Sequence, residues 1–207
     1  MKLSRMALLA SVTLICSCSI LPKPEPFEIY RLPSAQSASV SHATPQHWSL
    51  RLTKFQSSEA LNSPNIAVIL QGDVFSHYKG SRWSDPAPVL LRNRLLDGFQ
   101  RDGRVALLST DDSLFHGDLE LGGNLQAFQT EYQGTSASVV VRLDALLVRG
   151  YDQRILASRR FEVRQPLNDV QVPAVVAGFG QANDQLTTQV VNWAVEQGQR
   201  LAPPPRP

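Results

Sequence analysis

Apolar and polar residues alternate along long segments in the second half of the chain. The alternation covers residues 118–132, 138–149 and 155–163, and residues 150–153 form a predicted turn between the last two. An apolar residue at every second position places the apolar side chains on one face of a β-strand. The three segments therefore predict an antiparallel meander with one face packed on the core.

Shorter apolar segments predict further strands. They cover residues 27–32, 48–52, 66–70, 74–78 and 105–108. The fourth segment follows the third closely enough to be its hairpin partner. The residues between the first two segments, 33–45, are rich in Ser, Ala and Pro and indicate a loop.

Two segments repeat apolar residues every three or four positions, which is typical of helices. The first follows Asp85 and Pro86, which suit a helix cap and a first turn, and Gly103 marks its end. Its apolar face carries Val89, Leu91, Leu95, Leu96 and Phe99. The second has a stripe of Val175, Phe179, Ala182, Leu186, Val190 and Trp193, weakened at its start by Gly178 and Gly180. The predicted fold is a single α/β domain, a mostly antiparallel or mixed β-sheet with two main helices packed on one face.

The first residues of the chain predict a secretory signal. Lys2 and Arg5 give a positive start, and residues 6–15 are apolar or small without a charge. This apolar segment is shorter than the roughly 20 residues that span a bilayer. It therefore predicts targeting followed by removal, not a membrane span.

Both cysteines lie at the end of this segment, in Ile15-Cys16-Ser17-Cys18. The stretch resembles the bacterial lipobox, with Ile15 at −3, Ser17 at −1 and Cys18 as the lipidated N-terminus. Cys16 in that role would place the bulky Ile15 at −1, where it is poorly accepted. An ordinary secreted protein with two incidental cysteines is the alternative. Lipidation of Cys18 leaves no free thiol in the mature chain, which excludes a disulfide and a CxC metal or redox site.

The residues after Cys18 predict an extended tether, because Pro22, Pro24 and Pro26 recur at every second position. Ser19 stands at +2 where Asp would be, and by the enterobacterial sorting rule this predicts the outer membrane. The expected divisions are a signal peptide at 1–17, the lipidated cysteine and tether at 18–26, one domain at 27–198 and a disordered Pro-rich tail at 199–207.

Charge and motifs exclude several classes of function. Loss of Lys2 and Arg5 leaves equal numbers of basic and acidic residues, which argues against a nucleic-acid partner. The sequence has no nucleophile elbow, zinc-binding helix motif, phosphate loop or dinucleotide glycine pattern. We therefore expect no catalytic residue, no metal and no cofactor beyond the diacylglycerol and N-acyl chain on Cys18.

Other charged groups favour structural explanations. The histidines (His42, His47, His77 and His116) are scattered over predicted loops and strand ends. Asp111 and Asp112 lack a third carboxylate at the spacing of a calcium loop and indicate a solvated turn. The arginines of the last predicted hairpin (Arg149, Arg154, Arg159, Arg160 and Arg164) favour a solvated sheet face over a patch for anionic lipid or an acidic partner.

One polar stretch is a candidate partner site. Residues 76–86 are predicted as an exposed loop that leads into the first helix and carries Tyr78, Arg82 and Trp83. Aromatic residues beside an arginine are common at binding hot spots. Packing of Trp83 onto the core at the helix start is an equal alternative.

The order of these motifs resembles the ABC-type transport auxiliary lipoprotein family. The lipobox and tether are followed by Tyr30-Arg31-Leu32-Pro33, then by Tyr78, Arg82-Trp83-Ser84-Asp85-Pro86, Leu90-Leu91 and Leu95. The resemblance covers about residues 27–197, and the 34–46 loop and the tail match nothing in it. It implies a fold similar to the anticodon-binding-domain-like class and no catalytic residues.

The resemblance also implies a function. The family includes the lipoprotein encoded beside the paraquat-inducible MCE transport genes, so we expect an outer-membrane lipoprotein facing the periplasm. It would dock an MCE-domain protein and its ABC permease during lipid traffic, with a ring-like homo-oligomer as an option. The alternatives are an outer-membrane assembly or chaperone lipoprotein and a periplasmic lipid-binding module.

Overall fold

The computed structural model describes residues 26–34 and 45–201. The predicted signal peptide, the lipidation of Cys18, most of the tether and the final Pro-rich residues lie outside the described residues. The same holds for most of the predicted 33–45 loop. Within the described part of the chain, no helix is long and apolar enough to cross a bilayer.

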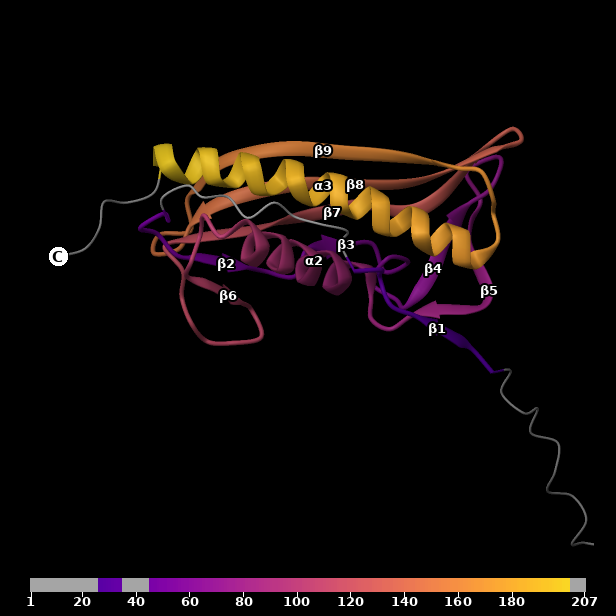
Figure 1. Cartoon of the computed structure of the whole chain (residues 1–207), viewed down its shortest axis with the longest axis horizontal. Helices are drawn as coiled ribbons and strands as arrows, with labels where there is room; N and C mark the ends of the chain where they lie inside the picture. The colour runs from indigo at the N-terminus through magenta and orange to yellow at the C-terminus, as the bar shows by residue number, and fades with distance from the viewer. Residues whose placement is uncertain (1–25, 35–44, 202–207) are drawn as a thin grey trace, which may run out of the picture.

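Three long antiparallel strands form one half of the sheet (Figure 1). They are β7 (Leu119–Gln133), β8 (Ser136–Arg149) and β9 (Ile155–Leu167). β8 pairs with β7 on one side and with β9 on the other, both antiparallel. The predicted meander is therefore confirmed, and β9 continues beyond its predicted end at residue 163.

The other edge of β7 pairs with three short parallel strands in succession: β2 (Leu50–Leu52), β3 (Gln56–Ser57) and β4 (Asn65–Ile69). Outside these lie β6 (Leu108–Thr110) on β2, β5 (Phe75–Trp83) on β4, and β1 (Glu28–Tyr30) on β5. The result is a nine-stranded mixed sheet within the described residues. The predicted strand at 105–108 is shifted, because Val105 forms only an isolated bridge to Gln46 and the ladder begins at Leu108.

A β-bulge in β7 corrects the predicted alternation. The register shifts between Leu125 and Ala127, so Leu125 pairs with Leu143 while Ala127 pairs with Arg142. One extra residue moves every following side chain to the opposite face. Ala127 therefore leaves the face of Leu125, and Phe128 takes the inward position beside Val141.

Helices α2 (Ala87–Asp102) and α3 (Val172–Leu201) cover one face of the sheet, as predicted (Figure 1). The predicted Asp85 cap is wrong, since Pro86 occupies the N-cap position without a side-chain hydrogen bond to the helix. Gly103 ends α2 as predicted, with a φ of 75° and its N–H donating to the Phe99 carbonyl. Helix α3 continues to Leu201, so residues 199–201 are helical where a tail was expected.

Gly178 explains how α3 lies so close to the sheet. A Cβ at this position would lie 2.6 Å from Leu167 Cδ2 and 3.3 Å from Val139 Cγ2. Glycine disfavours a helix by about 1 kcal/mol relative to alanine. The glycine that weakens the predicted helix start is thus the residue that permits its packing on β8 and β9.

The sheet face away from the helices carries paired charges. Arg160 Nε lies 2.5 Å from Asp144 Oδ1, and Arg142 Nε lies 2.6 Å from Glu162 Oε2. Arg164 pairs with both Glu162 and Glu131, at 2.7 Å and 2.8 Å. Arg160 and Arg164 therefore lie on a solvated face, as expected, and each is matched by an acid.

This ladder predicts lower stability in acid. The Arg160 guanidinium holds the pKa of Asp144 below its ordinary value, and Arg142 does the same for the pKa of Glu162. A depressed carboxyl pKa stabilises the fold above the unfolded pKa, and this stabilisation is lost as the pH falls through the folded pKa. We expect the melting temperature to fall between pH 7 and pH 3, less steeply in an Asp144→Asn, Glu162→Gln double variant. Equal falls in both proteins would contradict the assignment.

Candidate partner-docking site

The predicted partner residues do not lie on an exposed loop. Tyr78, Arg82 and Trp83 belong to β5, which pairs with β4 on one edge and with β1 on the other. The loop prediction is wrong because two partner strands supply the backbone hydrogen bonds of this polar stretch. Alternation along β5 then directs neighbouring side chains to opposite faces of the sheet.

Trp83 is part of the core, with 1% of its surface exposed. Its ring makes edge-to-face contacts with Phe179 on α3 at 5.1 Å and with Phe128 on β7 at 6.1 Å. Phe128 and Phe179 stack on each other at 4.9 Å. The structure thus matches the core-packing alternative for Trp83, and the ring offers no surface to a partner in this conformation.

Arg82 and Tyr78 differ from Trp83 and from each other. Arg82 is partly exposed, and its guanidinium carbon lies 5.0 Å from the ring centre of Phe27. Tyr78 is half-buried, and burial raises its pKa to about 12, against a smaller lowering by the Thr130 hydroxyl. A partner role for these two residues stays a prediction, and they do not form one surface with Trp83.

A hollow at the hairpin end of the sheet is the more suitable docking surface. It has a volume of about 380 Å³ and is lined by Leu70, Gln71, Val74, Tyr132 and Gly134. Leu70, Gln71 and Val74 come from the β4–β5 turn, Tyr132 lies near the end of β7, and Gly134 lies in the β7–β8 turn. Gln71 Nε2 donates a hydrogen bond of 3.4 Å to the Gly134 carbonyl and joins the two turns.

The rim of this hollow is apolar and exposed. Leu70, Val74 and Phe75 expose 43%, 55% and 43% of their surfaces. The turn between them contains Gly72 and Asp73 with φ values of 74° and 60°, and Leu70 N donates to the Val74 carbonyl at 2.9 Å. An apolar hollow next to an aromatic ring can accept an apolar side chain of a partner protein.

Sequence reasoning missed this hollow. Residues 74–78 were correctly predicted as the hairpin partner of 66–70, but Tyr132 and Gly134 are distant in sequence. The available signal was the apolar pair Val74-Phe75 directly after the Gly72-Asp73 turn, where solvated residues are usual. Tyr78 remains linked to the site, because the Tyr132 hydroxyl is near enough to act on the Tyr78 pKa.

A second hollow of about 520 Å³ lies beside α2, with Arg31, Arg94 and Arg101 in its lining. Two of these arginines, Arg94 and Arg101, are matched by acids. Arg101 Nη2 lies 2.8 Å from Asp97, and Arg94, whose pKa is lowered by burial, lies 3.4 Å from Asp184. Arg101 is thus paired within α2, and Arg94 joins α2 to α3.

No metal cluster is found in the part of the chain that the structure describes. Nowhere among residues 26–34 and 45–201 do three histidine, cysteine or acidic side chains gather as ligands could. His42 lies outside these residues. Asp111 and Asp112 approach a guanidinium instead of forming a free turn, since Arg92 lies 2.5 Å from Asp111 and 2.6 Å from Asp112.

The chain is similar to known proteins both in sequence and in fold. A family model described as ABC-type transport auxiliary lipoprotein component matches residues 30–191. A crystal structure of a Xanthomonas campestris protein of the family DUF330 is similar, with a TM-score of 0.76 and 29% identity, over 84% of this chain and 97% of that one. A crystal structure of another uncharacterized protein has a TM-score of 0.63 at 15% identity, over 82% of this chain and 99% of that chain, and supports the fold alone.

One curated relative is an uncharacterized protein of Bradyrhizobium diazoefficiens. It is 27% identical over 170 residues, which are 78% of this chain and 46% of the relative. The chain therefore spans about half the length of the curated relative that it matches.

Proposed function

The chain belongs to the family of ABC-type transport auxiliary lipoprotein components, and from this premise we propose that it is a non-catalytic, lipid-anchored subunit of an intermembrane lipid transport system. The family match over most of the domain carries the proposal. Acyl chains on Cys18 would hold the protein in the outer membrane, with the domain in the periplasm. Ser19 after the cysteine supports this location through the sorting rule.

The proposed partner is a periplasmic MCE-domain protein with its ABC permease. The hollow formed by Leu70, Val74 and Tyr132 is the proposed contact. Figure 1 shows the two hairpin turns on the upper side of the view, whereas β1 and the described N-terminal end project from the lower side at the same end of the long axis. A domain tethered through its N-terminus would therefore present the hollow toward the periplasm. A ring of several copies is compatible with this arrangement and stays a prediction.

Val74→Asp is expected to reduce recovery of the MCE-domain protein at least tenfold in a pull-down from solubilised membranes. A desolvated carboxylate in an apolar contact costs several kcal/mol, and about 1.4 kcal/mol corresponds to tenfold. Ile155→Asp is the matched control, because Ile155 is a β-branched residue that is 58% exposed, close to the 55% of Val74. Mass spectrometry identifies and counts the partners.

The outcomes separate the site from the function. Equal recovery with both variants would exclude the hollow as the contact and leave the transport role in place. Absence of an MCE-domain protein from the wild-type sample would overturn the proposed function. Recovery of an outer-membrane β-barrel protein in its place would favour the assembly or chaperone role.

A lipid-binding module is the second candidate, because the hollow is apolar and about 380 Å³ in volume. Known ligand pockets start at about 300 Å³. Lipid extraction from the purified domain, followed by mass spectrometry, tests this role. A stoichiometric phospholipid that is lost in Val74→Asp would support it.

A further inference from the structure

The loop between β6 and β7 exposes two large apolar side chains. Leu114 and Phe115 are 94% and 73% exposed, the highest fractions among the large apolar residues of the described chain. Exposed apolar groups of this size mark contact sites for proteins or membranes when they occur together. The rest of the loop is polar, with Ser113 before the pair and His116 after it.

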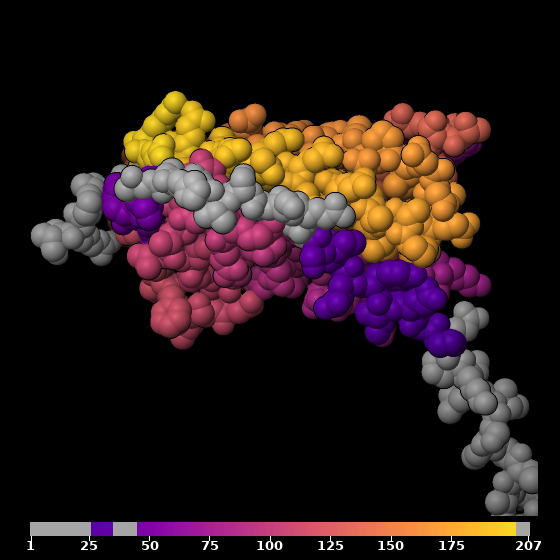
Figure 2. All heavy atoms as spheres, in the orientation of Figure 1, coloured from indigo at the N-terminus to yellow at the C-terminus, as the bar shows by residue number. Residues whose placement is uncertain are grey.

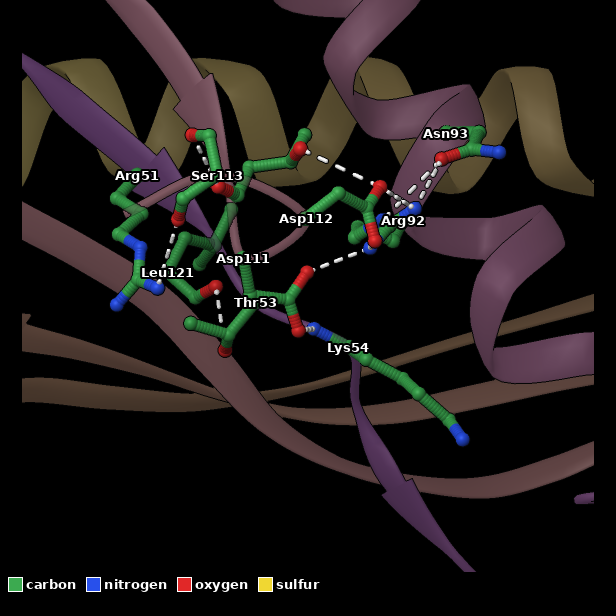
Figure 3. A network of polar contacts seen from close by, with 10 residues as sticks. Arg51, Thr53, Lys54, Arg92, Asn93, Asp111, Asp112, Ser113 and Leu121 are labelled. Carbon is green, nitrogen blue, oxygen red and sulfur yellow. Dashed lines mark hydrogen bonds and ion pairs between the residues drawn. The ribbon is translucent and has the colours of Figure 1, made fainter. Parts of the chain in front are cut away.

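The loop is firmly attached to the fold, as Figure 3 shows. The Arg92 side chain on α2 is 6% exposed and pairs with both Asp111 and Asp112. The Lys54 amide donates to Asp111 Oδ2 at 2.8 Å, and Arg51 Nη2 donates to the Ser113 carbonyl at 3.4 Å. The backbone that carries the two exposed side chains is thus held in place, so little backbone entropy remains to be lost on binding.

The far end of the loop is fixed in the same way. Asp118 Oδ2 accepts hydrogen bonds from the Ser49 amide at 2.9 Å and from the Ser49 hydroxyl at 2.8 Å. The Asp118 amide donates to the Ser49 hydroxyl at 2.9 Å, and its carbonyl accepts from the Gly150 amide. The apolar pair is therefore held between two fixed points.

The position of the loop favours a membrane as its partner. Figures 1 and 2 show the loop on the lower side of the view, the side from which β1 and the described N-terminal end also project, although the two lie at opposite ends of the long axis. The segment from Cys18 to Pro26 reaches at most about 30 Å even when fully extended. Lipid on Cys18 would therefore keep this side near the bilayer.

We propose that Leu114 and Phe115 insert into the interfacial region of a phospholipid bilayer, as a second membrane contact beside the lipid anchor. The proposal rests on the lipid-anchored placement in the proposed function. A single anchor limits the distance of the domain from the membrane, and a second contact also fixes its orientation. The hairpin hollow then points away from the membrane.

The small size of the exposed apolar pair favours a membrane over a protein as its partner. A stable protein interface takes about 20–30 residues from each side, whereas two apolar side chains at a loop tip suffice to enter a membrane interface. Leucine and phenylalanine are among the apolar side chains that peripheral segments bury at the boundary between headgroups and acyl chains.

A fluorescent label at position 115 tests the proposal. Phe115→Cys in the mature lipidated protein is labelled with an environment-sensitive dye and reconstituted into vesicles of phosphatidylethanolamine and phosphatidylglycerol. Mass spectrometry first confirms the acylation, which blocks the Cys18 thiol. We expect the emission to move to shorter wavelength and to be quenched by spin-labelled lipids. Phe75→Cys, on the opposite side, is the matched control and is expected to show neither effect.

Each other outcome overturns the proposal. Emission at position 115 that stays at its value in water excludes insertion. Emission that changes only after the purified MCE-domain protein is added assigns the loop to a protein contact. Because the vesicles contain no transport protein, these results are independent of the pull-down, where failure of the proposed function would appear.

Discussion

Trp83→Ala is expected to lower the free energy of unfolding by about 3–5 kcal/mol, the range for truncating a buried aromatic residue. The Trp83 ring is 1% exposed and packs edge-to-face on Phe128 and Phe179. Its removal leaves a cavity between β5, β7 and α3 that these elements cannot close without moving. Urea denaturation followed by circular dichroism measures the loss.

Two further variants control this prediction. Phe115→Ala removes an exposed aromatic residue and is expected to change the stability by less than about 0.5 kcal/mol. Trp83→Phe keeps most of the ring contacts and removes an indole N–H that has no hydrogen-bond partner among the described residues, so a smaller loss than for alanine is expected. A Trp83→Ala protein as stable as the wild type would contradict the core assignment.

The expected loss of stability in Trp83→Ala affects how binding experiments with this variant are interpreted. A Trp83→Ala protein that fails to bind its partner is expected to fail because part of its fold is lost. The exposed Val74 separates the two effects, since its substitution changes the surface at the hairpin end and leaves the aromatic core intact. Docking is therefore tested at the hollow and stability at Trp83.

The long elements of the fold could be predicted from the sequence because each carries many repeats of one period. β8 repeats an apolar residue at every second position from Ala137 to Leu147, and α3 keeps its apolar stripe from Val175 to Trp193. In such segments the repeat of apolar residues is enough to specify a strand or a helix. The hairpin of β4 and β5 was predictable for the same reason, since its strands are joined by the Gly72-Asp73 turn.

Features that depend on distant partners could not be predicted. The last residues of β5 form a strand because β1, from the start of the chain, pairs with them and places Ile29 opposite Arg82. The bulge before Ala127 is not marked by glycine or proline. The hollow at the hairpin end needs Tyr132 and Val74 together, and no local pattern joins them.

The burial of the Arg92 charge could not be predicted for a related reason. Arg92 lies on a helix whose predicted apolar face holds for Leu91, Leu95 and Phe99, although Leu90 is buried in place of Val89. The Arg92 side chain is nevertheless 6% exposed, because Asp111 and Asp112 reach it from the β6–β7 loop. The sequence alone presents these acids as a solvated turn. Their pairing becomes evident only when β6 is placed beside β2 and the loop returns over α2.

Arg92→Met is expected to lower the free energy of unfolding by about 2–4 kcal/mol. Loss of one partner from a buried ion pair costs about 3–5 kcal/mol, and water reduces the cost here because the Asp111 and Asp112 side chains are 29% and 70% exposed. Amides of residues 111–117 should also exchange faster with solvent deuterium. Arg160→Met is the matched control, because it removes an exposed guanidinium from Asp144, and little change is expected.

The pH dependence of Arg92→Met gives a second test. In the wild type, burial raises the pKa of Asp111, but the Lys54 amide and the Arg92 guanidinium outweigh burial and hold the pKa below its ordinary value. Removing Arg92 raises this pKa, so the variant has less stability to lose as the carboxyl is protonated. The stability difference between wild type and variant should therefore be largest near pH 7 and shrink toward pH 3. A stability difference that stays constant over this pH range would show that Arg92 acts through packing alone. A loss of stability no larger than that of Arg160→Met would show that the ion pair does not hold the loop in place.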